Sequence, residues 1–266
     1  MAGVRPPPVA AEFDRSALHR RLDQGLVAMG PEMDAALDAP ARDRLIAFLA
    51  LLMRWNRAYN LTAVRDPAEM VPRHLLDSLA VLPWISRGPV LDAGTGAGLP
   101  GIPLAVARPE LRFTLLDGNG KKARFVRQAV LELGLDNVEV VHSRLEAYRP
   151  AEKFATITAR AVASLSDLLG RCAHLAAADA RLLALKGRLP EQEIAALMDG
   201  ASPSLSATEP IPSASGLPGG TAPTVSAAAS ASDHALASHW VHRLCVPQLD
   251  GERNLIEISF HATAHG

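Results

Sequence analysis

The strongest chemical signal in the sequence is the run Val90-Leu-Asp-Ala-Gly-Thr-Gly-Ala-Gly-Leu-Pro-Gly101, in which apolar residues lead directly into closely spaced glycines. Glycines allow positive φ and let a ligand approach the backbone closely. A helical pattern follows the run, so the glycines connect a strand to a helix. Open α/β sheets bind their ligands at this end of a strand. The run therefore predicts a ligand-binding turn.

Two classes of ligand compete for this turn. Gly96, Gly98 and Gly101 match G-x-G-x-x-G, the dinucleotide fingerprint, which is a weak signal by itself. Here, however, the first glycine after the strand is Gly94, and Asp92 lies two residues before it. An acidic residue followed by G-x-G-x-G suits a cationic ligand such as S-adenosylmethionine, whose aminoacyl end carries an ammonium and a sulfonium but no phosphate.

A second carboxylate, Asp117, ends the next expected strand, 23 positions after Gly94. A carboxylate at this point can accept hydrogen bonds from both ribose hydroxyls of a nucleoside. Both ligand classes contain a ribose, so Asp117 does not distinguish them. The chain shows no dehydrogenase-like acid/base set, which favours S-adenosylmethionine over NAD.

The elements that must position these residues follow from apolar spacing. Residues 14–83 are predicted to be helical, with one apolar stripe in the stretch 45–59 and a helix start at Asp66-Pro67. After Gly88, short apolar runs alternate with helical stretches, which predicts an α/β fold with a mostly parallel, Rossmann-like sheet. The strands are expected at 90–93, 113–116, 138–141, 155–158 and 182–185, with helices at 121–133 and 164–175, and with an antiparallel C-terminal hairpin at 242–246 and 255–260.

The same pattern divides the chain into an N-terminal helical region, 1–88, and a larger domain, 89–266. Residues 200–239 are mainly Ala, Ser, Pro and Gly, with only two formal charges. Such a composition cannot bury enough apolar area to form a packed core. This stretch is expected to be a low-complexity insertion.

The composition of the chain limits which partners and which cellular location can be expected. Lys and Arg number 27 against 28 Asp and Glu, so any nucleic-acid binding must use a local basic patch. The two cysteines, Cys172 and Cys245, match no metal spacing. The N-terminus lacks the apolar core of a secretory signal, and no stretch has the length of a membrane span. We expect a cytoplasmic protein without a metal or a membrane partner.

The chain resembles the bacterial ribosomal RNA small-subunit methyltransferase G family, formerly called glucose-inhibited division protein B. The resemblance covers roughly residues 40–198 and resumes at 246–258. It is carried by DAGTGAGLPGIPLA, FTLLDGNGKKARFVRQ, the run Thr158 to Ala163, Leu185-Lys186-Gly187, and two N-terminal signatures, Arg54 to Thr62 and Arg73 to Leu79. Several motifs in one order are far more specific than a single glycine turn.

The resemblance implies transfer of a methyl group from S-adenosylmethionine to N7 of one guanine in 16S rRNA, guanine 527. No catalytic side chain is expected, because N7 carries a lone pair and no proton, so alignment and electrostatics suffice. The cofactor-binding positions that the resemblance implies are Gly94, Leu99, Leu145, Glu146 and Arg160, with Asp117 from the general methyltransferase pattern. The chain departs from the family at Asp117-Gly118 and Lys121-Lys122, where Asp-Ser and Lys-Arg are usual.

The RNA substrate, 16S rRNA or a small-subunit precursor, adds a further expectation. Guanine N7 lies in a groove of A-form RNA that side chains cannot enter, so the base should be unpaired or flipped out. Candidate phosphate contacts are Arg73, His74, Lys121, Lys122, Arg124 and Arg127. The last four are favoured because no acid lies among them, although each taken alone fits a solvated helix face. His74 fits a buried histidine equally well.

Two alternatives remain open from the sequence. One is an NAD-dependent oxidoreductase with a helical cap. The other is a non-catalytic RNA-binding assembly protein on a methyltransferase fold. Binding of S-adenosylhomocysteine or of NAD would separate the oxidoreductase from the methyltransferase.

Overall fold

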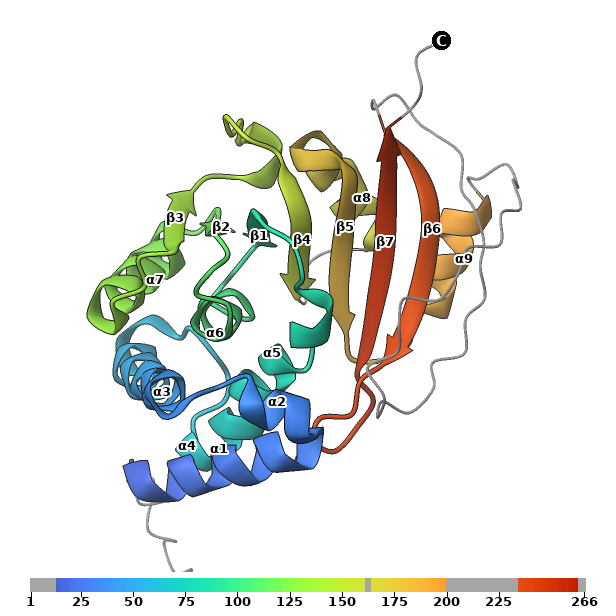
Figure 1. Ribbon diagram of the computed structural model, residues 1–266. Coiled ribbons are helices and arrows are strands. Elements are labelled where there is room, and N and C mark those ends of the chain that lie inside the picture. The colour runs from blue at the N-terminus through green and yellow to red at the C-terminus, as the bar shows by residue number, and fades with distance from the viewer. Residues whose placement is uncertain (1–12, 161–163, 200–233, 263–266) are drawn as a thin grey trace, which may run out of the picture.

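A computed structural model of the chain describes residues 13–160, 164–199 and 234–262. Its centre is a sheet of seven strands in the order β3-β2-β1-β4-β5-β7-β6 (Figure 1). The strands are β1 Val90–Ala93, β2 Phe113–Asp117, β3 Val138–His142, β4 Phe154–Arg160, β5 Ala176–Lys186, β6 His234–Arg243 and β7 Asn254–Ala262.

The first five strands are parallel, and β7 runs antiparallel to both of its neighbours, β5 and β6. Strand β6 therefore runs in the same direction as β5, and β7 alone is reversed. This arrangement confirms the predicted mostly parallel sheet with an antiparallel hairpin at its C-terminal end. The carboxyl ends of β1, β2, β4 and β5 lie at one edge of the sheet, and the site is built there.

The position predicted for the first hairpin strand was wrong. Strand β6 spans His234–Arg243, whereas residues 244–246 of the predicted strand 242–246 are outside it. Its start also lies within the segment 200–239 that composition assigned to the insertion. The strand pairs along β7 from His234 opposite Ala262 to Arg243 opposite Asn254, so pairing rather than local sequence defines it. Residues 200–233 lie outside the described part of the chain.

Helices cover both faces of the sheet (Figure 1). Strand β1 shows how its two faces are used, because Val90 packs with one apolar cluster and Leu91 with the other. The first face carries α1 Arg15–Met29, α2 Pro31–Ala35, α3 Ala39–Tyr59, α6 Gly101–Ala107 and α7 Gly120–Leu133. The second face carries the short turn Leu145–Ala147, α8 Leu165–Cys172, the turn Ala173–Leu175 and α9 Glu191–Asp199.

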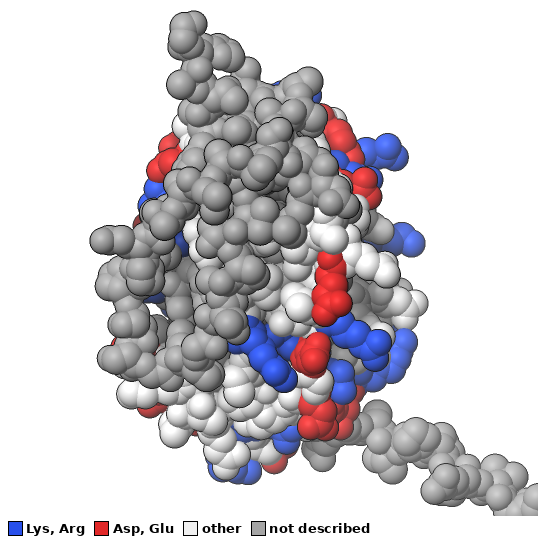
Figure 2. Space-filling model, turned by 90° about the vertical axis from the view of Figure 1, so that its right-hand side faces the viewer, with Lys and Arg blue, Asp and Glu red and all other residues white. Residues whose placement is uncertain are grey.

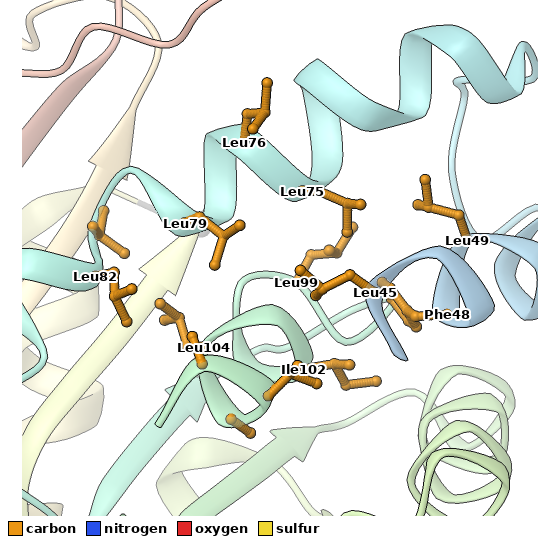
Figure 3. Close-up of a cluster of buried hydrophobic side chains, with 14 of the residues drawn as sticks. Leu45, Phe48, Leu49, Leu75, Leu76, Leu79, Leu82, Leu99, Ile102 and Leu104 are labelled. Atoms are coloured by element: carbon orange, nitrogen blue, oxygen red, sulfur yellow. The ribbon is translucent and has the colours of Figure 1, made fainter. Parts of the chain in front are cut away.

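The long helix α3 follows the predicted apolar stripe. Asp38 caps its start by accepting a hydrogen bond from Ala41 N at 2.8 Å, and Asn60 ends it in the left-handed conformation. The side chains of Leu45, Phe48 and Leu49 are fully buried. Figure 3 shows them near Leu75 of the next helical segment and near Leu99 and Ile102 at the start of α6. Residues on both sides of position 88 therefore contribute to one core.

One continuous helical segment lies against the carboxyl edge of the sheet. It starts as α4, Pro67–Met70, with Asp66 as the predicted cap accepting from Ala68 N at 2.9 Å. It continues as a π-helical stretch, Val71–Leu76, and ends as α5, Asp77–Leu79. π-Helical turns are wider than α-helical ones and occur frequently at functional sites. Here the stretch brings Arg73, His74 and Asp77 to the strand ends.

Candidate cofactor and substrate site

The glycine-rich turn after β1 has the backbone that the sequence predicted. Gly94, Gly96 and Gly98 have φ of 69°, 60° and 81°, which L-residues with a side chain rarely adopt. At Gly96 an added Cβ would meet only Gly94 O at 3.9 Å and Lys122 Nζ at 4.0 Å, so the space above the turn is open. The turn thus leaves the backbone at Gly96 open to a ligand.

Asp92 lies beneath this turn and does not face a ligand. Its side chain is fully buried, and its Oδ2 accepts hydrogen bonds from Thr95 Oγ1 at 2.6 Å and Gly101 N at 2.8 Å. Its Oδ1 accepts from Thr158 Oγ1 at 3.1 Å. Burial raises the pKa of Asp92, although these three hydrogen bonds oppose the shift. The carboxylate of Asp92 therefore shapes the turn and the start of α6, and it does not line the pocket.

Asp117 fixes the turn from the neighbouring strand. Its Oδ2 accepts from Gly96 N at 2.8 Å, and its Oδ1 accepts from Asn119 N at 2.7 Å. A carboxylate oxygen has two lone pairs, so each oxygen of Asp117 can accept one further hydrogen bond. The position suits a pair of ribose hydroxyls next to the exposed backbone of Gly96.

A pocket of about 690 Å³ opens beside the turn. Its walls come from the turn, from the helical segment around Arg73, from the ends of β4 and β5, and from the β6–β7 connection. Five cationic side chains line it with a single carboxylate: Arg73, Lys122, Arg160, Lys186 and Arg253 with Asp77. The pocket is thus strongly basic in a protein whose formal net charge is -1.

Asp77 joins two of these cations. Arg160 Nη1 donates to Asp77 Oδ2 at 3.1 Å, and Arg253 Nε donates to Asp77 Oδ1 at 2.9 Å. The three side chains are 22%, 26% and 10% exposed for Arg160, Arg253 and Asp77. One carboxylate therefore fixes guanidinium groups from the end of β4 and from the β6–β7 connection, which are far apart in the sequence.

His74 lines the same pocket but is buried. Its Nε2 forms a hydrogen bond with Thr62 Oγ1 at 3.0 Å, and the side chain of Asn56 holds both the backbone N and O of Thr62. Burial, and secondly the charge of Arg160, lower the pKa of His74 to about 4. The imidazole is uncharged at neutral pH, so the expected role of His74 as a phosphate contact is corrected to that of a buried histidine.

The predicted cofactor positions fall into two groups. Gly94, Leu99 and Arg160 line the pocket. The Leu99 side chain is 4% exposed and points into the cluster with Leu45 and Leu75 (Figure 3), so only its backbone is available to a ligand. The other three predicted positions, Asp117, Leu145 and Glu146, do not line this pocket. Leu145 is buried in the core of the second sheet face, and Glu146 is exposed and pairs with Arg171 at 3.3 Å.

The four basic residues of α7 do not act as one cluster. Lys122 lines the pocket at the turn, whereas Lys121, Arg124 and Arg127 line a second groove on the other side of the helix, together with His142. Lys121, Arg124 and Arg127 are spaced by three residues and follow one side of the helix, whereas Lys122 points away from Arg124, two residues later. Among the described residues, Lys121, Arg124 and Arg127 have no ion pair.

Three residues of the site were not predicted from the sequence: Asp77, Lys186 and Arg253. Lys186 ends β5 and pairs with Glu193 of α9 at 3.0 Å. Asp77 and Lys186 belong to the quoted motifs, so their place in those motifs was the available signal. Arg253 carried none, because only the β6–β7 pairing brings it to the pocket. Two features are not found in the described part of the chain: a helix long and apolar enough to cross a membrane, and a cluster of potential metal ligands.

The sheet, with its reversed β7 and its open turn after β1, is the fold of S-adenosylmethionine-dependent methyltransferases, and S-adenosylmethionine is the cofactor of this class. The residues present fit this cofactor, because the backbone at Gly96 is open and each carboxylate oxygen of Asp117 can accept a further hydrogen bond. The sequence narrows the class further. The model of the rRNA small subunit methyltransferase G family matches residues 41–215, and the chain belongs to this family.

Relatives that carry the same family name align over most of the chain. The protein from Marinobacter nauticus is 52% identical over 196 residues, which cover 74% of this chain and 90% of the relative. The protein from Stenotrophomonas maltophilia is 53% identical over 67% of this chain and 82% of its own length. Among solved structures, a methyltransferase from Geobacter sulfurreducens is 17% identical over 80% of this chain and 90% of its own, with a TM-score of 0.49.

Proposed function

We propose that this protein transfers the methyl group of S-adenosylmethionine to N7 of guanine 527 in 16S rRNA. The observation that carries the proposal is the basic pocket beside the glycine turn in a chain of this family. Relatives at 52% and 53% identity are named ribosomal RNA small subunit methyltransferase G, which supports rRNA as the substrate. Such a substrate places the reaction in the cytoplasm.

The cofactor roles proposed here are those that the family implies for the matching positions. Backbone groups of Gly94 and Leu99 hold the aminoacyl end, and Asp117 accepts hydrogen bonds from the ribose hydroxyls. Leu145 and Glu146 follow β3, at the same edge of the sheet, and flank the adenine. Arg160 faces the reacting end of the cofactor from the end of β4.

The chemistry needs no proton acceptor at the reacting atom. Guanine N7 attacks with its own lone pair, and the bound cofactor supplies a methyl group already activated by the sulfonium. Within the described pocket, the two acid/base candidates are occupied: Asp77 binds two arginines, and His74 is held by Thr62 with a pKa of about 4. The contribution of the protein is alignment of donor and base.

The RNA is held on both sides of the turn. The target base leaves its stack to reach the pocket, where Arg73 and Lys122 line the wall. The groove with Lys121, Arg124 and Arg127 lies on the outer side of α7 and binds the adjoining RNA backbone. The substrate is 16S rRNA, free or within a small-subunit precursor.

Mass mapping of 16S rRNA tests the proposal. We expect rRNA from cells that lack the gene to lack one N7-methylguanine, and the wild-type gene to restore it. The Gly96→Val variant should not restore it, because a β-branched side chain is strained at φ of 60°. Restoration by a Gly96→Val protein that does not bind S-adenosylhomocysteine would indicate a non-catalytic role. A thermal shift with NAD but none with S-adenosylhomocysteine would indicate an oxidoreductase.

A further inference from the structure

The charge of the pocket exceeds what the cofactor requires. S-adenosylmethionine carries an ammonium, a sulfonium and a carboxylate, so it is a cation overall. Five cationic side chains and one carboxylate line the space that receives it, and Glu69 and Glu193 pair with Arg73 and Lys186 from outside the lining. An excess of positive charge remains around Arg160, Arg253 and Lys122. Like charges in a partly enclosed site repel one another, and the repulsion is strongest where water is excluded. This excess of positive charge suits an anionic group of another molecule.

The side chains around Asp77 show where this anion binds. Arg160 and Arg253 each donate to one oxygen of the same carboxylate, so two positive charges share one negative charge. Arg160 Nη1 also reaches Arg73 O at 3.4 Å, and Arg253 Nη1 donates to Glu252 O at 2.7 Å. The Nη2 groups of both arginines have no hydrogen-bond partner among the described residues. The pair is thus fixed in place and retains donors.

The surroundings of Arg253 keep these donors accessible. A Cβ at Gly187 would lie 4.0 Å from Arg253 Nη1, and a Cβ at Gly251 would lie 3.8 Å from it. Because both neighbours are glycine, no side chain covers the guanidinium from these two positions. The side chain of Asn254 reaches Gly187 O at 3.2 Å and holds the end of β5 next to β7.

We propose that Arg253 and Arg160, fixed side by side on Asp77, bind a phosphate group of the RNA substrate at the entrance of the target base to the pocket. Guanidinium groups suit this task because their planar N–H donors match phosphate oxygens in pairs. Asp77 is a positioning residue: it holds the two guanidiniums and does not contact the RNA. The inference rests on the proposed rRNA substrate.

Two other roles for Arg253 predict different behaviour. If it binds the carboxylate of the cofactor, its loss weakens cofactor binding and leaves the salt dependence of RNA binding unchanged. If it only ties the β6–β7 connection to α5, its loss lowers the melting temperature and changes neither kind of binding. Only a phosphate contact changes the salt dependence, because each such contact releases counterions from the RNA.

The test compares Arg253→Gln with Arg243→Gln. Arg243 lies on the same hairpin, is exposed and has no ion pair among the described residues, so it is a matched control. Binding of a 16S rRNA transcript is measured over a range of KCl concentrations, and binding of S-adenosylhomocysteine by calorimetry. For Arg253→Gln we expect a salt slope lower by about 0.7 and about tenfold weaker RNA binding. The Arg243→Gln variant should keep the salt slope and the RNA affinity of the wild type. Both variants should bind S-adenosylhomocysteine with wild-type affinity.

An unchanged salt slope for Arg253→Gln would overturn the phosphate assignment, and so would weakened S-adenosylhomocysteine binding with intact RNA binding. If Arg253→Gln does not fold, Arg253→Lys keeps the charge but loses the paired donors. That variant should bind RNA several-fold more weakly at an unchanged slope, and wild-type RNA affinity would contradict the proposal. A failure of the proposed function would give a different result. The wild-type protein would then bind the transcript with the expected salt slope but would transfer no methyl group to it.

Discussion

His74 shows how a residue at the rim of a basic pocket can remain uncharged. It lies one residue after Arg73 and lines the same space as Arg160, yet its side chain is buried and bound to Thr62. Burial and the neighbouring guanidinium both disfavour the imidazolium, so the pKa falls to about 4. A histidine that stays neutral adds no repulsion to a pocket that already holds several cations.

This low pKa has a consequence for stability. The pKa of a histidine in the unfolded chain is about 6.5. Between pH 6.5 and pH 4, His74 is therefore protonated in the unfolded chain but not in the folded protein. The contribution of His74 to the free energy of unfolding is therefore fully present above pH 6.5. It decreases by about 3 kcal/mol in total as the pH falls towards 4. In the His74→Gln variant, which can still bond to Thr62, the free energy of unfolding should fall less between pH 7 and pH 4. Urea unfolding at several pH values measures it, and parallel curves for the two proteins would contradict the burial of a neutral imidazole.

At the scale of the elements, local sequence predicted the strands that end in polar or glycine residues. Strand β1 runs into Gly94 and β2 ends at Asp117, so both ends are marked in the sequence. Strand β6 was misplaced because residues 234–239 continue the alanine- and serine-rich composition before them, and only β7 supplies their partners. The same limit explains Arg253, whose contact with Asp77 joins positions 176 residues apart in the chain. No local pattern encodes such a contact.

Helix α7 predicts a separation of two functions on one element. Arg124→Ala with Arg127→Ala should lower the salt slope of RNA binding by about 1.4, because two phosphate contacts are lost, and should leave S-adenosylhomocysteine affinity unchanged. Lys122→Ala, on the pocket side beside the target base, should instead lower the rate of methyl transfer. Alanine favours helix, so α7 itself should persist. Titrations with the transcript and with S-adenosylhomocysteine give both values.

The control for α7 removes two arginines from other helices. Arg20 of α1 and Arg44 of α3 are exposed and have no ion pair within the described ranges. Their double alanine variant changes the net charge by the same amount and should keep the wild-type salt slope. If it lowers the slope as much as the α7 variant does, the RNA responds to overall charge, and the groove on α7 has no special role.

At the scale of the whole molecule, the distribution of charge matters more than its sum. The chain has 27 basic and 28 acidic residues, yet the pocket and the α7 groove collect cations almost without acids. Where described residues are visible in Figure 2, basic and acidic side chains lie next to one another instead of forming a patch of one sign. A nearly neutral protein can thus present a localised RNA-binding surface and avoid non-specific attraction to other nucleic acids.

The insertion is the remaining large feature of the molecule, and its composition predicts that it contributes little to stability or to methyl transfer. Deletion of residues 206–228 keeps eleven residues between α9 and β6, which end and begin at Asp199 and His234. A shorter connection costs less closure entropy, so the melting temperature should stay the same or rise by a few degrees, about 1 kcal/mol in stability. Methylation of 16S rRNA should continue at the wild-type rate.

A second variant, in which the same 23 positions are replaced by Gly and Ser, separates the effect of the length of the insertion from that of its sequence. If both variants lose methylation while cofactor binding persists, the natural sequence of the insertion takes part in RNA recognition; if only the deletion does, the length of the connection matters.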